Sequence, residues 1–293
     1  MIVGDFFQKE NIMRKFEFKA IENNENSKGI VTAYLHEPLV EMKDFINSFP
    51  NGYREKYPSV IVCPGGAYLF TSQREADPVA FEYLSAGYNV FILNYSVGEL
   101  AKDFLPLKEL SSLIMTIRDH SDEWGCDSDK IAVCGFSAGG HLAASSAILW
   151  NNEKFKEVFD TENGKNKPNA AILAYPVITA DEFAHEDSIK SVSGAEKGSE
   201  KYNFFSLEKR VNSDCAPIFV WHTVTDGLVP VENTIKLITE LQKNKISFEC
   251  HIFPDGDHGM SVCTNEVSSP SGHNNQWVKL SKNWLNKLFD YKL

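Results

Sequence analysis

Short apolar runs alternate with helix-like segments along most of this sequence, and that alternation limits the fold more than any other feature. The apolar runs are rich in β-branched residues and end at turn residues, as buried strands do. They lie within 29–39, 58–68, 89–97, 130–150, 169–177, 216–226 and 247–259. Helical periodicity occupies 77–88, 106–125, the second half of 130–150, 231–245 and 274–289. Such alternation predicts an α/β fold whose mostly parallel central sheet carries helices on both faces.

The domain organisation follows from what the sequence lacks. No internal repeat, low-complexity tract or linker interrupts the 293 residues, of which 43% are hydrophobic. This is enough apolar material for one large core, so we predict a single domain over 1–293. The polar segment 178–213 is predicted to be a small insertion over one end of the sheet that lines the site. Apart from the strand-like 29–39, residues 1–57 show no clear pattern.

Charge and cysteine content exclude several classes of protein. The net charge of −11 argues against nucleic-acid partners, which need clustered Lys and Arg. The six cysteines form no CxxC pair, which predicts reduced and mostly buried thiols. The first residues do not resemble a signal peptide, and no apolar run approaches transmembrane length. We therefore expect a cytoplasmic protein without a membrane partner, and the sequence leaves a homo-oligomer open.

The segment "KIAVCGFSAGGHLAASSAILW" (130–150) contains a GxSxG motif centred on Ser137. This motif alone is only moderately specific. Here it follows a buried strand and opens a helix, and a strained turn of that kind lifts a serine hydroxyl above the edge of a sheet. The context favours a nucleophile over a plain glycine turn. A serine hydroxyl needs a base, an orienting acid and oxyanion donors before it can attack.

The loop "CPGGAY" (63–68) is the predicted source of oxyanion donors. Backbone N–H groups of Gly66 and Ala67 would join that of Ala138, because small residues let the backbone approach a substrate closely. A bare turn is the alternative reading, and a phosphate cradle is disfavoured because no Gly-Lys-Ser/Thr follows. Tyr68, the last residue of this loop, is the best candidate for a substrate-binding aromatic, with core packing as the alternative.

An orienting acid should end a later strand, and Asp226 in "FVWHTVTDGLVP" has that position. A turn cap is the ordinary role of an Asp before Gly. The other candidate acids do not directly end an apolar strand; they are Asp181, Asp187, Asp255 and Asp257.

The base should come last, from a loop after the final strand, where His258 stands in "FPDGDHGM". His273, in a later loop, is the serious alternative. Three further histidines are less suitable because of their positions; they are His141 on the helix behind the serine, His222 before Asp226, and His251 inside a strand. The order Ser137, Asp226, His258 is the one expected of a hydrolase triad.

Other chemistry has little support in the sequence. No HExxH or closely spaced His/Cys set suggests a zinc ion, and no GxGxxG follows a strand. The triad chemistry itself needs no cofactor, so none is predicted.

Together, "CPGGAY", "GFSAGGH", "SLEKRV…APIFVWHTVTDGLVPVEN" and "FPDGDHG" resemble α/β-hydrolase esterases of the acetyl esterase and xylan-esterase-like group. The resemblance covers about 55–290 and extends to hormone-sensitive-lipase and prolyl-oligopeptidase relatives. It implies an α/β-hydrolase fold with the nucleophile, acid, base and oxyanion donors at the positions given above. It also implies a small-molecule ester substrate, namely short acyl groups such as acetyl on a sugar or xylo-oligosaccharide.

The chain departs from that group at three positions. Pro64 stands where lipase relatives carry a histidine, Ala67 replaces a glycine, and Thr225 replaces a second Asp. The first two affect the shape of the loop, not its N–H groups. A peptidase of the prolyl-oligopeptidase branch, or a non-catalytic ligand-binding protein on the same fold, remain as alternatives.

Overall fold

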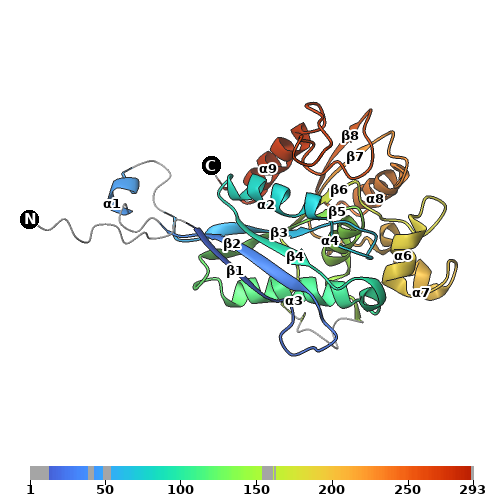
Figure 1. Cartoon of the computed structure of the whole chain (residues 1–293), viewed down its shortest axis with the longest axis horizontal. Helices are drawn as coiled ribbons and strands as arrows, with labels where there is room; N and C mark the ends of the chain where they lie inside the picture. The colour runs from blue at the N-terminus through green and yellow to red at the C-terminus, as the bar shows by residue number, and fades with distance from the viewer. Residues whose placement is uncertain (1–12, 39–42, 49–53, 154–160, 162, 292–293) are drawn as a thin grey trace, which may run out of the picture.

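The structure is a computed structural model that describes residues 13–38, 43–48, 54–153, 161 and 163–291. All its strands belong to one eight-stranded sheet of order β1-β2-β4-β3-β5-β6-β7-β8 (Figure 1). Among these strands only β2 runs against the others. Their bounds are β1 Met13–Lys19, β2 Ile30–His36, β3 Tyr57–Cys63, β4 Asn89–Asn94, β5 Cys126–Phe136, β6 Ala170–Ala174, β7 Ile218–Thr223 and β8 Phe248–Phe253. The expected mostly parallel sheet is confirmed.

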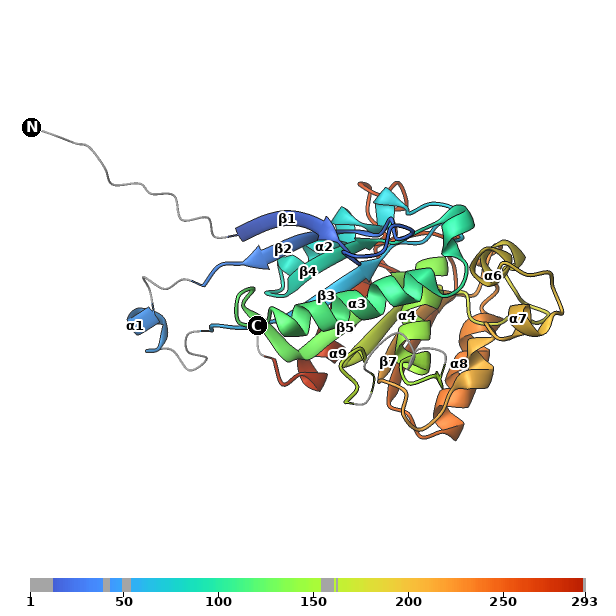
Figure 2. The ribbon, with the colours of Figure 1, turned by 90° about the horizontal axis from the view of Figure 1, so that it is seen from below.

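Helices cover both faces of this sheet. On one face α3, α4 and α8 contribute to a first core, and on the other α2 and α9 contribute to a second (Figure 2). The helices are α1 Lys43–Ile46, α2 Asp77–Leu84, α3 Leu105–Asp119, α4 Ala138–Leu149, α6 Glu186–Ser193, α7 Glu200–Asn203, α8 Glu232–Lys243 and α9 Gln276–Leu288. The described residues also form short 3₁₀ helices, namely η2 Gln73–Glu75, η3 Gly98–Ala101 and η4 Leu207–Arg210.

The two cores follow from the two-residue period of a strand. In β3, Ile61 and Cys63 enter the core beneath α3 and α4, whereas Val60 and Val62 enter the core beneath α2 and α9. Because successive side chains point to opposite faces, a strand buried on both sides must be apolar throughout. All six cysteines are free thiols and five of them are buried, as the absence of CxxC pairs predicts.

The structure corrects some element boundaries. The helix predicted over 106–125 ends at Asp119, after which a turn through Gly125 at φ 59° leads into β5. That strand begins at Cys126, four residues before its predicted start. β1 was not predicted at all; it pairs antiparallel with β2 at the edge of the sheet, and its side chains are exposed or half-buried.

The predicted insertion at 178–213 contains α6, α7 and η4. Both views place α6 and α7 side by side at one end of the molecule (Figures 1 and 2). The first twelve residues and part of the loop predicted at 50–58 lie outside the described residues. No helix in the described part of the chain has both the length and the apolarity needed to cross a membrane.

Two glycines allow the start of α4 to approach the sheet closely. A Cβ on Gly139 would lie 2.1 Å from the carbonyl oxygen of Cys63, and one on Gly135 would lie 2.1 Å from the carbonyl oxygen of Gly139. Both separations are far below contact distance, and the atoms met are backbone atoms. Glycine is therefore required at both positions to hold the helix against β3 and the loop that follows it.

Replacing Gly139 with alanine should destabilise the protein by about 2–3 kcal/mol or more, because backbone must move to admit the methyl group. Chemical denaturation of the variant would measure this. Gly272 provides the control, since nothing lies within 4 Å of its Cβ position. Gly272→Ala should change the free energy of unfolding by no more than about 0.5 kcal/mol. Equal effects of the two changes would contradict the close approach.

Candidate active site

Ser137 lies at a strained turn between β5 and α4. Its backbone is at φ 53° and ψ −117°, a region that residues with a Cβ rarely adopt. The turn is fixed from both sides, because the Ser137 N–H donates to the carbonyl of Ala174 at 3.0 Å and its carbonyl accepts from Val177 N–H at 3.1 Å. This conformation is the one expected of a nucleophile elbow.

Hydrogen bonds connect Ser137, His258 and Asp226 in one chain. His258 Nε2 lies 2.8 Å from Ser137 Oγ, and His258 Nδ1 lies 2.7 Å from Asp226 Oδ2. The three residues come from the elbow, the loop after β8 and the loop after β7, which meet at the carboxyl edge of the parallel strands. The imidazole is mostly buried, with 13% of its side chain exposed. The structure thus brings the three predicted residues together.

Asp226 accepts hydrogen bonds at both carboxylate oxygens. Oδ1 accepts from the N–H groups of Leu228 and Val229 at 2.9 Å each, and Oδ2 lies 2.7 Å from His258 and 3.3 Å from His222. Burial alone would raise the pKa of this carboxyl. The hydrogen bonds and the charge of His258 outweigh burial and hold the pKa well below its usual range. Asp226 is therefore an anion at neutral pH.

His222 is a neighbour of this carboxylate that the sequence only suggested. It is fully buried in β7, and its Nε2 also lies 2.9 Å from the carbonyl of Val229. Thr234 Oγ1 lies 2.8 Å from Nδ1. Because the carbonyl can only accept, Nε2 carries a proton and presents it to Val229 and Asp226. His222 thus helps to orient the acid and does not contact Ser137.

The loop 64–70, here called the glycine loop, follows β3 and packs against the elbow. A Cβ on Gly65 would lie 3.0 Å from Ser137 Cβ. The loop carbonyls are occupied: those of Pro64, Gly65, Gly66 and Tyr68 accept from Tyr95 Oη, Ser72 N, Leu69 N and Gly98 N, respectively. In the described chain, the N–H groups of Gly66, Ala67 and Ala138 donate to no other residue. The oxyanion role predicted for these three N–H groups is therefore not opposed by a bond to another described residue.

Tyr68 does not line the site, contrary to expectation. Only 1% of its surface is exposed, and its hydroxyl lies 2.9 Å from His141 Nδ1. His141 Nε2 lies 3.0 Å from the carbonyl of Phe205 in the insertion. The glycine loop turns through positive φ at Ala67 and Tyr68, and this turns the tyrosine ring into the core. Core packing, the alternative reading, is correct.

The alternative bases and acids lie elsewhere. His273 is exposed, and the centroid of its ring lies 5.3 Å from that of the Phe253 ring. His251 lies 2.9 Å from Glu249 within the same strand. Of the alternative acids, Asp181 forms an ion pair with Lys209 at 2.7 Å, and none of the four has a hydrogen bond to His258. The contacts therefore favour His258 and Asp226 over these alternatives.

A cavity of about 480 Å³ opens between the glycine loop, η3 and the insertion. Leu69, Gly98 and Asp187 contribute to it from three separate segments. The charges in its wall are mostly paired, with Lys102 2.5 Å from Glu99 and Lys190 2.8 Å from Glu196. The insertion contributes Asp187 and Lys190 to this cavity beside the glycine loop, and a role for the insertion at the site itself stays a prediction.

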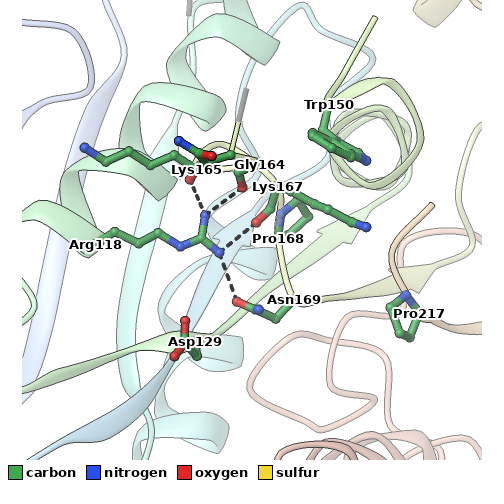
Figure 3. A pocket seen from close by; sticks show the side chains of 10 residues that line it. Arg118, Asp129, Trp150, Gly164, Lys165, Lys167, Pro168, Asn169 and Pro217 are labelled. Carbon is green, nitrogen blue, oxygen red and sulfur yellow. Dashed lines mark hydrogen bonds between the residues drawn. The ribbon is translucent and has the colours of Figure 1, made fainter. Parts of the chain in front are cut away.

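A larger cavity of about 730 Å³ lies at the opposite end of the strands. Its wall includes Asn169 and Pro217, which precede β6 and β7, so it is remote from the elbow. Figure 3 shows that Arg118 points into the loop there and donates to the carbonyls of Lys165 and Lys167. The guanidinium is thereby occupied in holding that loop, and this cavity has no part in the candidate site.

The strand order of the sheet and its likeness to solved structures define the class of this protein, which has the α/β-hydrolase fold. The chain belongs to the BD-FAE family, which matches residues 48–241. This confirms the resemblance to acetyl esterase and xylan-esterase-like proteins.

Known proteins support this membership. Endo-1,4-β-xylanase B of Butyrivibrio fibrisolvens is 32% identical over 272 residues, which cover 89% of this chain and 39% of that protein. Acetylxylan esterase of Xylanibacter ruminicola is 26% identical over 230 residues, covering 76% and 44%. The chain therefore spans about two fifths of the length of these curated relatives. A crystal structure of an acetyl ester-xyloside bifunctional hydrolase from Caldicellulosiruptor lactoaceticus matches with a TM-score of 0.80 at 30% identity, covering 95% of this chain and 97% of that one.

The buried His141 should make stability depend on pH. Burial lowers its pKa from 6.5 to about 4, so the unfolded chain binds this proton at a higher pH than the folded one. The stability that neutral His141 contributes is thus present above pH 6.5 and lost as pH falls towards 4. Between pH 7 and pH 5 this loss amounts to roughly 2 kcal/mol.

Denaturation at both pH values would test this in His141→Gln, which cannot titrate. The variant should be less stable at pH 7, yet lose roughly 2 kcal/mol less than the wild type on going to pH 5. His36 and His185, whose pKa values burial also lowers, remain in both proteins. Exposed His273→Gln is the matched control. An unchanged pH dependence in His141→Gln would contradict the assignment.

Proposed function

We propose that this protein is a serine esterase in which Ser137 is the nucleophile, His258 the general base and Asp226 the acid that orients it. The observation that carries the proposal is the hydrogen-bonded chain from Ser137 Oγ through the imidazole to the Asp226 carboxylate, with bonds of 2.8 Å and 2.7 Å. Membership of a family with esterase relatives supports the same chemistry.

In the first step, His258 Nε2 takes the proton of Ser137 as the serine oxygen attacks the ester carbonyl. The carbonyl oxygen becomes an oxyanion and accepts hydrogen bonds from the N–H groups of Gly66, Ala67 and Ala138. Asp226 stabilises the imidazolium without taking its proton. His258 then protonates the departing alcohol, which leaves an acyl group on Ser137.

The second half of the reaction repeats these roles with water. His258 takes a proton from a water molecule, which attacks the acyl group and releases the acid. Ser137 recovers its proton from the imidazolium, and the free enzyme returns. Every proton in the cycle passes through Nε2, so the hydrogen bond of Nδ1 to Asp226 can persist throughout. These steps require no metal ion or cofactor.

We propose acetyl groups on a sugar or xylo-oligosaccharide as the substrate. The names of two similar proteins, an acetylxylan esterase and an acetyl ester-xyloside bifunctional hydrolase, support this class. The 480 Å³ cavity beside the glycine loop also supports it, because paired charges and a serine line it. A neutral polyol can exchange hydrogen bonds with such a wall, whereas a long acyl chain would leave these charges desolvated without compensation.

Hydrolysis of aryl acetate, butyrate and octanoate, measured beside acetylated xylo-oligosaccharides, tests both parts. The wild type should prefer acetate and release acetate from the oligosaccharide. Ser137→Ala and His258→Ala should each lower kcat by at least about 10³-fold, because nucleophile and base act as one unit.

His273→Ala is the matched control and should retain kcat. No ester hydrolysis by the wild type, or full activity in Ser137→Ala, would overturn the esterase proposal. Loss of activity in His273→Ala with His258→Ala active would overturn the choice of base. A preference for octanoate would overturn the acetyl proposal and leave the mechanism standing.

A further inference from the structure

Glu75 is a buried carboxylate that the reaction described above does not use. It ends η2 and has only 4% of its surface exposed. Oε2 accepts a hydrogen bond from the Gly65 N–H at 2.9 Å, and Oε1 accepts one from the Tyr175 hydroxyl at 2.7 Å. A buried carboxylate is costly unless both oxygens find donors, and here each donor belongs to a segment of the active site.

The first donor belongs to the glycine loop. Gly65 directly precedes the proposed oxyanion donor Gly66, and its carbonyl accepts from Ser72 N–H at 3.0 Å. A Cβ on Gly65 would lie 2.6 Å from Glu75 Oε2 and 3.0 Å from Ser137 Cβ. The Glu75 carboxylate thus packs directly against the loop, on the side where the loop meets the nucleophile. Hydrogen bonds from two directions fix the orientation of Gly65.

The second donor connects the carboxylate to the base. Tyr175 follows β6, and its hydroxyl accepts a hydrogen bond from Ser261 N–H at 2.8 Å. Ser261 lies three residues beyond His258, and its own hydroxyl donates to the carbonyl of Arg74 at 2.5 Å. The Tyr175 ring meets the His258 ring edge to face, with centroids 5.0 Å apart. Tyr175 therefore contacts both the loop that carries His258 and the imidazole ring of His258 itself.

We infer that Glu75 is a positioning residue that, together with Tyr175, fixes the glycine loop and the loop of His258 relative to each other. The single carboxylate joins the segment that carries the oxyanion donors to the segment that carries the base. Ser137 contacts both segments, so this link fixes the distance between the oxyanion donors and the imidazole of His258. The inference rests on the proposed function, because positioning has meaning only if these groups react.

The electrostatic surroundings agree with this geometry. Burial raises the pKa of Glu75, while the hydrogen bonds from Tyr175 and Gly65 and the charges of His258 and Arg74 oppose the rise. The carboxylate and the imidazolium therefore attract each other. A displacement of about 1 Å at a reacting group can lower the rate by about 10²-fold, so a lost link between the two loops should be visible in kcat.

Three substitutions separate the parts of the link. Glu75→Ala removes both acceptors and should lower kcat by about 100-fold. Glu75→Gln retains an acceptor for Gly65 N–H but not for the Tyr175 hydroxyl, and should lower kcat by about 10-fold. Tyr175→Phe should resemble Glu75→Gln. In all three variants KM for aryl acetate should stay within about threefold, because the oxyanion donors act in the transition state.

The double variant with Glu75→Ala and Tyr175→Phe tests whether the two residues act as one unit. Its kcat should equal that of Glu75→Ala within about threefold, since the second change then removes nothing further. Additive losses would show two independent roles and overturn the inference. Thermal unfolding of every variant verifies that the protein assayed is folded, and Glu75→Gln provides the result if Glu75→Ala does not fold.

Glu109 offers a matched control. It is fully buried and accepts hydrogen bonds from Ser27, Gly29 and Ser96, none of which belongs to the proposed catalytic groups. Glu109→Gln should lower the melting temperature but leave kcat within about twofold. An equal loss of kcat in Glu109→Gln and Glu75→Gln would reduce the role of Glu75 to general stability and overturn the inference.

The outcomes also separate this inference from the proposed function. If the wild type hydrolyses no ester, or Ser137→Ala remains active, the proposed function fails. If the wild type is active and Ser137→Ala is not, while Glu75→Ala and Tyr175→Phe keep the wild-type kcat, only the positioning role fails. A large change in KM at constant kcat would place Glu75 in substrate binding and would also contradict it.

Discussion

The backbone of Ser137 is the constraint on which the rest of the site depends. A residue with a Cβ at φ 53° costs free energy, and the turn persists because Ala174 and Val177 hold the peptide on both sides. Because Gly135 and Gly139 have no side chain, the first turn of helix α4 can pack directly against the backbone of the sheet. The elbow thus presents one hydroxyl at the carboxyl edge of β5, where the loops after β3, β7 and β8 can reach it.

Two buried carboxylates, those of Asp226 and Glu75, lie close to this elbow. Asp226 lies directly behind His258 and accepts four hydrogen-bond donors, which keep it ionised in a buried position. Glu75 lies beneath the glycine loop and bonds to Gly65 and Tyr175. In the proposed mechanism the first carboxylate stabilises the imidazolium, and the second fixes the loops between which the reaction takes place. Both roles depend on the same feature, namely that every oxygen of a buried carboxylate must be satisfied.

Sequence patterns predicted the sheet and the order of the candidate residues, because both depend on local signals. Buried strands appear as apolar runs, and residues such as Asp226 and His258 stand where such runs end. β1 was missed because an exposed edge strand has no apolar run and is fixed by its partner β2. Tyr68 was misassigned because positive φ values at Ala67 and Tyr68 turn the ring inward. Glu75 belongs to no motif, and only the folded chain brings it to Gly65.

The proposed mechanism requires that Ser137 becomes acylated during turnover. The most direct measurement is mass spectrometry of the protein quenched in acid while it hydrolyses an activated acetate ester, followed by digestion to locate the modification. The proposed mechanism predicts one acetyl group per chain, on the peptide that contains Ser137. In a His258→Ala variant that has been acylated with a more reactive ester, the adduct should last longer. Acetylation confined to another residue, or rapid hydrolysis with no adduct under any quench condition, would contradict it.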